Sequence, residues 1–406
     1  VGRPLVAVVN EEFVRKFGLG GGAVGKRVNE GNALVTRSPD RPPKSFQIIG
    51  VVRNAAYNNV KEDKPQPLFF TAHQQDSTTG RLVFYVRSRI GADAIVRAIP
   101  PLVAGVDIAG TVVSSGDARF KPGDVVLTHC NGQPDGYGYP LRIWAYDQPE
   151  SIGWYGEEAV VGEWQLVHAP LDCGLSLWEI AALPLRAPTA YHMWRRALGI
   201  FRLKVSDTKL RRLNVLSFGG GVGECFLMLA KSEGHHAYFC SGSPERRKAL
   251  EAQGIRGIDQ KAFNRFASRE DVRAFQGEVR KLTDSVNMHI VCDMLRGPVF
   301  DAGLAVAARC GVNVSAGWQL SQQVTYNSTL QSVKQVTIDH THYETVEGCA
   351  AATELYGVVF KPSVHKEIYA FEDLPRAMRE MYDATQTGIP IVRVAKQMPA
   401  SVQKLV

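Results

Sequence analysis

The sequence has no apolar run long enough to cross a membrane, which takes about 18 or more consecutive apolar residues. Its first residues, VGRPLVAVVNEEF, lack the charged segment and the long apolar core of a secretory signal peptide. They also lack an initial methionine, which fits an internal fragment of a longer chain. These absences predict a cytoplasmic protein with no membrane partner.

Cysteines with a metal-binding or redox spacing are absent as well. The chain has 7 cysteines, an odd number, and none of them forms a Cys-x-x-Cys pair. Several stand in apolar segments, where cysteine behaves as a small hydrophobic residue. The sequence therefore predicts neither a disulfide framework nor a cysteine-rich zinc lobe, and it fits a reducing compartment.

Clusters of one charge sign are lacking, although the net charge is +7. Residues 1–98 hold 15 Lys and Arg against 8 Asp and Glu, whereas the rest of the chain is balanced. Scattered basic residues are typical of a solvated surface, so no nucleic-acid partner is predicted. A length of 406 residues with 45% hydrophobic and 21% charged residues indicates a globular protein of two or three domains.

What the sequence does contain is a strand, a glycine turn and a helix in immediate succession. Residues 214–218 (NVLSF) are typical of a short buried strand, glycines occupy 219, 220, 221 and 223, and residues 224–231 are typical of a helix. Glycine lets a phosphate approach bare backbone N–H groups at a helix N-terminus, and it lets the helix pack closely on the strand. The stretch therefore predicts a binding site for a nucleotide diphosphate.

The end of the next expected strand, residues 236–240, distinguishes between nicotinamide cofactors. An Asp or Glu there would accept a hydrogen bond from the adenosine ribose of NAD, whereas small hydroxyl groups and an arginine suit the 2′-phosphate of NADP. The chain has Ser241, Ser243 and Arg246 in this place and no acid at the strand end. We therefore predict NADP as the cofactor.

Strands and helices alternate through the remainder of this region. Strands are expected at 254–259, 288–293, 311–317 and 332–338, and helices at 245–253, 270–282 and 299–308. This alternation predicts an α/β fold with a doubly wound parallel sheet. Ahead of it, β-branched runs separated by Pro-Gly and Asp turns predict a small barrel with strands at 106–114, 125–128, 157–161 and 164–168.

Several motifs, in a fixed order between residues 103 and 396, resemble the medium-chain dehydrogenase/reductase superfamily in its zinc-independent quinone oxidoreductase and enoyl reductase branch. The resemblance implies a Rossmann NADP-binding domain at 186–355, inserted in a partial GroES-like β-barrel at 99–185 and 356–406. The first barrel strands of that family would precede Val103, where a different segment stands. The motifs are AGVDIAGTVVSSGDARFKPGDVVL, LPLRAPTAYHMW, NVLSFGGGVGECFLMLAKSEGHHAYFCSGSPERRKALEAQGI, HIVCDMLRG and YAFEDLPRAMREMYDATQTGIPIVRV.

The resemblance also implies which residues bind the cofactor. One group forms the glycine turn under the pyrophosphate, a second holds the 2′-phosphate, and a third lies beside the nicotinamide. In that order they are Ser217, Gly220, Gly221, Val222 and Gly223; Ser241 and Arg246; and Thr189 and Gly317.

The zinc ligands of the related alcohol dehydrogenases are not matched. Gly105, Val106 and Asp107 stand where those enzymes carry Gly-His-Glu, and His129 and Cys130 are too few for a tetrahedral site. The resemblance thus implies an NADPH-dependent reductase without a metal, which passes a hydride to an activated alkene or a quinone as its small-molecule substrate. It also implies a homodimer, and it leaves the catalytic residues unknown.

Two sets of side chains near the expected helix at 190–198 have alternative interpretations. Tyr191 and His192 would relay a proton or pack in the core. Arg186, Arg195 and Arg196 would contact an acidic substrate tail or lie on the helix surface.

Residues 1–98 follow a separate α+β pattern that ends at a boundary marked by Pro100 and Pro101, with strands expected at 5–10, 46–52 and 81–87 and helices at 11–17 and 92–99. The runs VAVVNEEFVRKF, GAVGKRV, FQIIGVVRNAAYNNVKEDKPQPLFF and RLVFYVRSRIGADAIVRAI resemble the extracytoplasmic core domain of MacB-like ABC transporter permeases. Those permeases have membrane helices on both sides of the domain, and none is present here. The resemblance therefore implies a displaced domain and no transport activity.

Two alternative functions remain open from the sequence. A methyltransferase that uses S-adenosylmethionine shares the strand, glycine turn and helix, although it usually carries an acid at the end of the second strand. A non-catalytic fusion fragment with the permease-like domain is the other alternative.

Overall fold

The structure is a computed structural model, and it divides into two compact units, residues 1–89 and 90–406. No helix in the described part of the chain is long and apolar enough to span a membrane. The described residues are 5–29, 45–54, 66–71, 106–130, 134–141, 143, 156–317, 320, 321, 323–383, 385–396 and 400–403.

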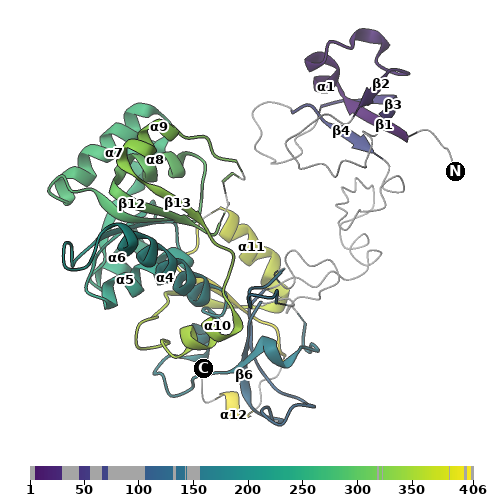
Figure 1. Ribbon diagram of the computed structural model, residues 1–406. Helices are drawn as coiled ribbons and strands as arrows, with labels where there is room; N and C mark the ends of the chain where they lie inside the picture. The colour runs from purple at the N-terminus through teal and green to yellow at the C-terminus, as the bar shows by residue number, and fades with distance from the viewer. Residues whose placement is uncertain are drawn as a thin grey trace. The chain divides into compact units, whose positions relative to one another are not determined.

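The first unit contains a four-stranded sheet with the order β2-β3-β1-β4 (Figure 1). Strand β1 runs parallel to β3 and antiparallel to β4, and β2 runs antiparallel to β3. Helix α1 (Glu11–Lys16) follows β1 directly because Asn10 caps it by accepting a hydrogen bond from the Phe13 N–H at 2.9 Å. The strands are β1 (Leu5–Asn10), β2 (Arg27–Asn29), β3 (Ser45–Val52) and β4 (Phe69–Thr71).

Three of these elements fall where the sequence predicts them, at 5–10, 11–17 and 46–52. The strand expected at 81–87 and the helix expected at 92–99 lie outside the described residues, as does the boundary at Pro100 and Pro101. The resemblance of residues 1–98 to a permease domain remains a prediction.

The second unit contains a six-stranded sheet with the order β10-β9-β8-β11-β12-β13, of which β12 and β13 are labelled in Figure 1. Every neighbouring pair is parallel, and in chain order the sequence of strands is the 3-2-1-4-5-6 of a dinucleotide-binding fold. The predicted doubly wound α/β fold is confirmed. The strands are β8 (Asn214–Phe218), β9 (His236–Ser241), β10 (Arg256–Asp259), β11 (Met288–Asp293), β12 (Ala307–Ser315) and β13 (Thr337–His340).

Helices cover both faces of this sheet, so its central strands are buried throughout. Successive side chains of β8 point to opposite faces: Val215 packs in the core beneath α4 and α5, whereas Leu216 and Phe218 pack beneath α7 and α8. The helices are α4 (Arg186–Lys204), α5 (Val222–Ser232), α6 (Pro244–Glu251), α7 (Arg269–Leu282), α8 (Pro298–Val306) and α9 (Ser328–Lys334), with the 3₁₀ helix η4 (Gln260–Phe266).

The remaining elements frame the sheet. Strands β5 (Ala109–Thr111), β6 (Val125–Thr128) and β7 (Leu166–His168) form an antiparallel sheet, and β14 (Val364–Ala370) pairs in parallel with β15 (Ile389–Arg393). The helical elements here are η1 (Gly20–Gly22) in the first unit, and η3 (Glu163–Gln165), α3 (Leu177–Ala181), α10 (Val346–Thr353), η5 (Phe371–Asp373), α11 (Leu374–Tyr382) and α12 (Ala400–Gln403) in the second.

Helix α4 is longer than the sequence predicts, and it contributes residues both to the glycine turn and to a cavity next to the helix. It has 19 residues instead of the expected nine from 190 to 198, because Pro188 falls in its first turn, where proline is tolerated. Its side chains Trp194 and Phe201 are buried against α5 and the sheet. Packing therefore holds the helix in a fixed position along one face of the Rossmann domain.

One predicted strand is absent, and another begins later than predicted. Residues 157–161 are not in a strand, and residues 332–334 belong to α9, which is followed by β13. Asn327 caps α9 by accepting from the Leu330 N–H at 3.0 Å, and Gln335 ends it in the left-handed conformation. The helix caps thus override the β-branched pattern of this segment.

Candidate nucleotide site and an adjoining cavity

The glycine turn joins β8 to α5 at the C-terminal edge of the parallel sheet, between β9 and β11. Gly221 has φ +67° and ψ −101°, a conformation that favours glycine. It is the N-cap residue of α5 and provides no side-chain capping hydrogen bond. The first turn of α5 therefore offers backbone N–H groups and the positive end of a helix dipole to an anion.

Gly223 lets α5 pack directly on β8. A Cβ at this position would collide with Oγ of Ser217 and would lie 3.3 Å from the carbonyl oxygen of Phe218. Ser217 and Val222 are buried in the protein interior. Of the predicted cofactor-binding residues, Ser217, Val222 and Gly223 therefore determine the shape of the turn from its interior side.

Two arginines lie on the backbone of the turn. A Cβ at Gly220 would collide with the guanidinium group of Arg246, and a Cβ at Gly221 would lie 3.1 Å from Nε of Arg186. Arg246 comes from α6 and Arg186 from the first residue of α4. Planar guanidinium groups are the preferred partners of phosphate oxygens, so the turn carries suitable cations for a diphosphate.

A buried glutamate lies beneath these arginines in the first turn of α5. Oε1 of Glu224 is 3.3 Å from Nε of Arg246, an ion-pair distance without the alignment of a hydrogen bond. Burial raises the pKa of the Glu224 carboxyl above its ordinary value, although Arg246, Arg186 and a hydrogen bond from the Gly221 backbone oppose this shift. The sequence analysis missed Glu224, since only the fold brings it to Arg246.

Arg186 is itself held by two further contacts. Its Nη1 donates to Oδ2 of Asp107 at 3.2 Å and to the carbonyl oxygen of Ala182 at 3.0 Å. Burial raises the pKa of Asp107, with Arg186 opposing the shift. Asp107 thus ties the segment before β5 to the start of α4.

The end of β9 is organised as the sequence predicts only in part. Ser241 accepts a hydrogen bond from the Ser243 N–H at 3.2 Å, and Ser243 caps α6 by accepting from the Arg246 N–H at 3.3 Å. Arg247 donates to the carbonyl oxygen of Ser241 at 2.5 Å and to Oδ1 of Asp259 at 3.1 Å. Arg247 therefore fixes the strand end, while Arg246 reaches the glycine turn.

Thr189 and Gly317, which the resemblance places beside the nicotinamide, have structural contacts of their own. Oγ1 of Thr189 donates to the carbonyl oxygen of Leu185 at 2.7 Å, and the residue is buried. A Cβ at Gly317 would collide with the carbonyl oxygen of Met294, so this position requires a small residue. Their contact with a nicotinamide remains a prediction.

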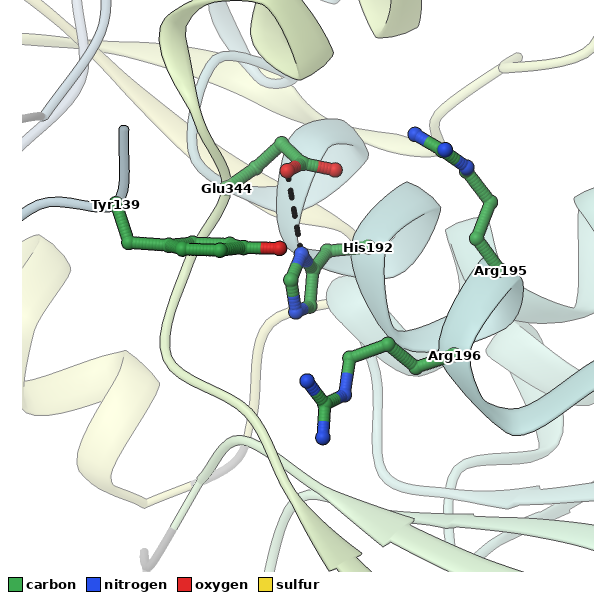
Figure 2. A pocket seen from close by; sticks show the side chains of 5 residues that line it. All are labelled: Tyr139, His192, Arg195, Arg196 and Glu344. Carbon is green, nitrogen blue, oxygen red and sulfur yellow. Dashed lines mark hydrogen bonds and ion pairs between the residues drawn. The ribbon is translucent and has the colours of Figure 1, made fainter. Parts of the chain in front are cut away.

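A cavity of about 200 Å³ lies next to α4 (Figure 2). His192 and Glu344 are both buried there, and Nδ1 of His192 is 3.2 Å from Oε1 of Glu344. The rings of Tyr139 and His192 meet edge to face at 5.2 Å, and Figure 2 shows the Tyr139 hydroxyl turned toward the imidazole. The lining residues are Tyr139, His192, Arg195, Arg196 and Glu344.

The cavity bears on the alternatives left open by the sequence. His192 is buried as a core residue would be, but it pairs with a carboxylate. Cζ of Arg195 lies 5.3 Å from the centroid of the Tyr191 ring. Arg196 donates two hydrogen bonds to the carboxylate of Asp339, at 2.9 and 2.7 Å. Arg195 and Arg196 therefore stand at a polar cavity, and Arg186 stands at the glycine turn.

Within the described ranges, no group of three or more His, Cys, Asp or Glu residues is arranged to hold a metal ion. His129 is buried, and burial lowers its pKa to about 4. Cys130 packs with Tyr343 and Cys349 in a small buried cluster. Independence from zinc remains a prediction.

Comparisons with known proteins agree with this fold. Residues 84–171 match the family model of the alcohol dehydrogenase GroES-like domain. The chain is 26% identical over 309 residues to "Putative quinone oxidoreductase YhfP" of Bacillus subtilis, covering 72% of this chain and 82% of that protein. It is also 30% identical over 144 residues to a mycocerosic acid synthase-like polyketide synthase of Mycolicibacterium smegmatis, covering 36% of this chain and only 6% of that much longer protein.

Among solved structures, the 2-octenoyl-CoA carboxylase reductase CinF, in complex with NADP and 2-octenoyl-CoA, superposes with a TM-score of 0.59. The two sequences are 25% identical, and the match covers 74% of this chain and 70% of that chain.

Proposed function

The chain belongs to the medium-chain dehydrogenase/reductase superfamily, and on that premise we propose that it is an NADPH-dependent oxidoreductase that reduces an activated alkene or a quinone. The observation that carries the proposal is the pair of guanidinium groups, Arg186 and Arg246, on the backbone of the glycine turn. A glycine turn at a helix N-terminus with two arginines beside it suits a dinucleotide with more than one phosphate.

The residues of the turn would divide the work of binding between them. The N–H groups at the start of α5 would hold the diphosphate, and Gly220 and Gly221 would admit it because they have no Cβ. Arg246 would hold the 2′-phosphate from the start of α6, near Ser241. Bound NADPH supplies the hydride, while the protein orients it and excludes water.

Three features support this choice of cofactor and substrate class. The end of β9 has no acidic residue that would accept from the ribose of NAD. One relative is named a quinone oxidoreductase, and a structural neighbour is a 2-octenoyl-CoA reductase solved with NADP. An electron-poor double bond conjugated to a carbonyl is common to both substrate classes.

The proposal is tested by calorimetric titration of the full chain with NADPH, NADH and S-adenosylmethionine. We expect NADPH to bind at least about tenfold more tightly than NADH, since hydrogen bonds to a charged phosphate are strong. S-adenosylmethionine should not bind. Tighter binding of NADH or of S-adenosylmethionine would overturn the cofactor assignment.

Turnover is then followed by the loss of NADPH absorbance with 1,4-naphthoquinone or crotonyl-CoA as the acceptor. Oxidation of NADPH by either acceptor supports the reductase. NADPH binding without turnover of either acceptor would contradict it and favour a nucleotide-binding module without catalysis.

The homodimer that the sequence resemblance implies is also part of the proposal. In the described sheet, β13 is an edge strand with one strand neighbour, β12. An exposed edge can pair with a second copy of itself. Light scattering that gives the mass of a single chain would exclude this arrangement.

A further inference from the structure

The cavity beside α4 contains a buried acceptor that lacks a donor. Oε1 of Glu344 accepts from the Thr345 N–H at 2.8 Å and faces Nδ1 of His192. Oε2 of the same carboxylate is buried and has no hydrogen-bond partner in the described part of the chain. Such an atom costs folding free energy unless a donor, either water or a ligand, reaches it, so the cavity suits a ligand that donates a hydrogen bond.

The backbone holds this carboxylate in place. A Cβ at Gly348 would collide with the carboxyl group of Glu344, so α10 leaves room for it only because position 348 is glycine. Thr345 caps the same helix by accepting from the Gly348 N–H at 3.1 Å. The position of Glu344 is therefore built into the start of α10.

His192 provides a second acceptor of the same kind. A carboxylate can only accept a hydrogen bond, so in the neutral tautomer that fits this contact the proton lies on Nδ1, which faces Glu344. The other ring nitrogen, Nε2, then carries a lone pair, and Figure 2 shows it turned away from Glu344. Oε2 of Glu344 and Nε2 of this tautomer of His192 can therefore each accept a hydrogen bond from a ligand.

The cavity is also lined by two arginines that retain N–H groups for donating hydrogen bonds to a ligand. Among the described residues, Arg195 makes no hydrogen bond or ion pair and only stacks on Tyr191. Arg196 uses Nε and Nη2 for Asp339, which leaves its Nη1 outside that pair. Guanidinium N–H groups outside such pairs favour a ligand with negatively charged oxygens, to which they can donate hydrogen bonds.

We propose that this cavity binds a small oxyanion that carries its own O–H group, such as a phosphate monoester, hydrogen phosphate or a hydroxycarboxylate. The anionic oxygens bind Arg195 and Nη1 of Arg196, and the O–H donates to Oε2 of Glu344 or to Nε2 of His192. A fully deprotonated oxyanion has no proton to donate, so the buried carboxylate repels it. The residues that line the cavity are not those assigned to the nicotinamide cofactor.

Matched pairs of probes test this discrimination by calorimetric titration of the full chain at constant ionic strength and about pH 7. Inorganic phosphate retains a proton at this pH, whereas sulfate of similar shape does not. L-malate carries a hydroxyl group, whereas succinate does not. Phosphate should bind at least about tenfold more tightly than sulfate, or malate than succinate, because one hydrogen bond to a charged group separates the members of each pair.

The two pairs distinguish the sources of the ligand. A preference within the phosphate pair alone identifies phosphate chemistry, and one within the malate pair alone identifies a hydroxycarboxylate. Equal affinities within both pairs, or no binding of any of the four probes, would overturn the proposal.

Two substitutions assign the binding to the cavity. Arg195→Gln should weaken binding of the preferred probe by about tenfold, whereas Arg211→Gln, which removes an exposed arginine elsewhere, should leave it unchanged. Glu344→Gln supplies an amide N–H, so sulfate or succinate should gain affinity until the preference disappears. Circular dichroism checks the fold of each variant.

If Glu344→Gln does not fold, the wild-type preference and Arg195→Gln decide the matter. Unchanged binding in Arg195→Gln would place the ligand elsewhere and contradict the assignment.

Discussion

Nε of Arg246 lies 3.3 Å from Oε1 of Glu224, so an arginine of α6 is anchored on a carboxylate in the first turn of α5. The same guanidinium group covers the backbone of Gly220. The carboxylate therefore holds the arginine beside the glycine turn, and the 2′-phosphate of an entering NADPH would exchange one anionic partner of Arg246 for another.

Arg246→Ala should weaken the binding of NADPH by about tenfold or more and that of NADH by less, because only NADPH has the 2′-phosphate. Titration calorimetry with both nucleotides measures the two changes. Lys248→Ala removes an exposed cation from the same helix and should change neither affinity. Equal losses for the two nucleotides would show that Arg246 contacts only the diphosphate.

Glu224→Gln should change how stability depends on pH. Since burial raises the pKa of Glu224 above its ordinary value of 4.5, the folded state binds the proton more tightly than the unfolded state does. Its contribution to the free energy of unfolding is then largest below pH 4.5 and is lost as the pH rises through the raised pKa.

Urea denaturation at a series of pH values measures this effect of Glu224. The wild type should show the decline, and Glu224→Gln should lack this component. Glu354→Gln, at an exposed position, is the control and should keep the wild-type profile. A profile for Glu224→Gln that matches the wild type would contradict the assignment.

Gly223→Ala should destabilise the protein by about 1–3 kcal/mol, because its Cβ would collide with Oγ of Ser217. Ser217→Ala removes that oxygen, so the double variant should recover most of the loss. A double-mutant cycle from urea denaturation gives the coupling energy between the two positions. Additive effects would mean that α5 shifts away from β8 and that the close contact does not set the stability.

His289 should make the protein sensitive to acid. Its Nδ1 accepts from the Asn214 N–H at 2.8 Å, and burial, with Arg202 nearby, lowers its pKa from 6.5 to about 4. The contribution of the neutral ring is complete above pH 6.5 and is lost as the pH falls toward about 4, since the unfolded state takes up the proton first.

His289→Asn should therefore reduce the loss of unfolding free energy between these two pH values. At neutral pH the variant should be less stable by about 1–3 kcal/mol, because Oδ1 of asparagine can still accept from the Asn214 N–H but the packing of the buried ring against Phe201 is lost. His236→Asn changes an exposed histidine and should behave as the wild type does. A wild-type acid profile in His289→Asn would refute the role of this ring.

Local patterns predicted most of the Rossmann domain. The strand at 214–218 and the glycine turn carry their signals within a few residues, and so does the strand at 288–293. The segment 332–338 misled the prediction because β-branched residues favour strands, whereas the cap at Asn327 fixes a helix. Residues 157–161 have a strand-like composition but pair with no described strand.

The candidate sites depend on contacts that no local pattern encodes. The sequence predicts Gly220, Gly221 and Arg246 at one site because a known turn and strand end supply the template. His192 and Glu344 are 152 residues apart, and their ion pair arises only when the segment after β13 returns to α4. The sequence does show that Glu224 is an acidic residue directly after the glycines. It does not show that Arg246 is the partner of this residue.

Helix α4 touches the glycine turn through Arg186 and the cavity through His192, six residues or about 9 Å farther along its axis. A packed helix moves as a unit, so a displacement at one end is felt at the other. Thermodynamic linkage then requires reciprocity: whatever factor an occupied cavity applies to the affinity of the turn, an occupied turn applies to the affinity of the cavity.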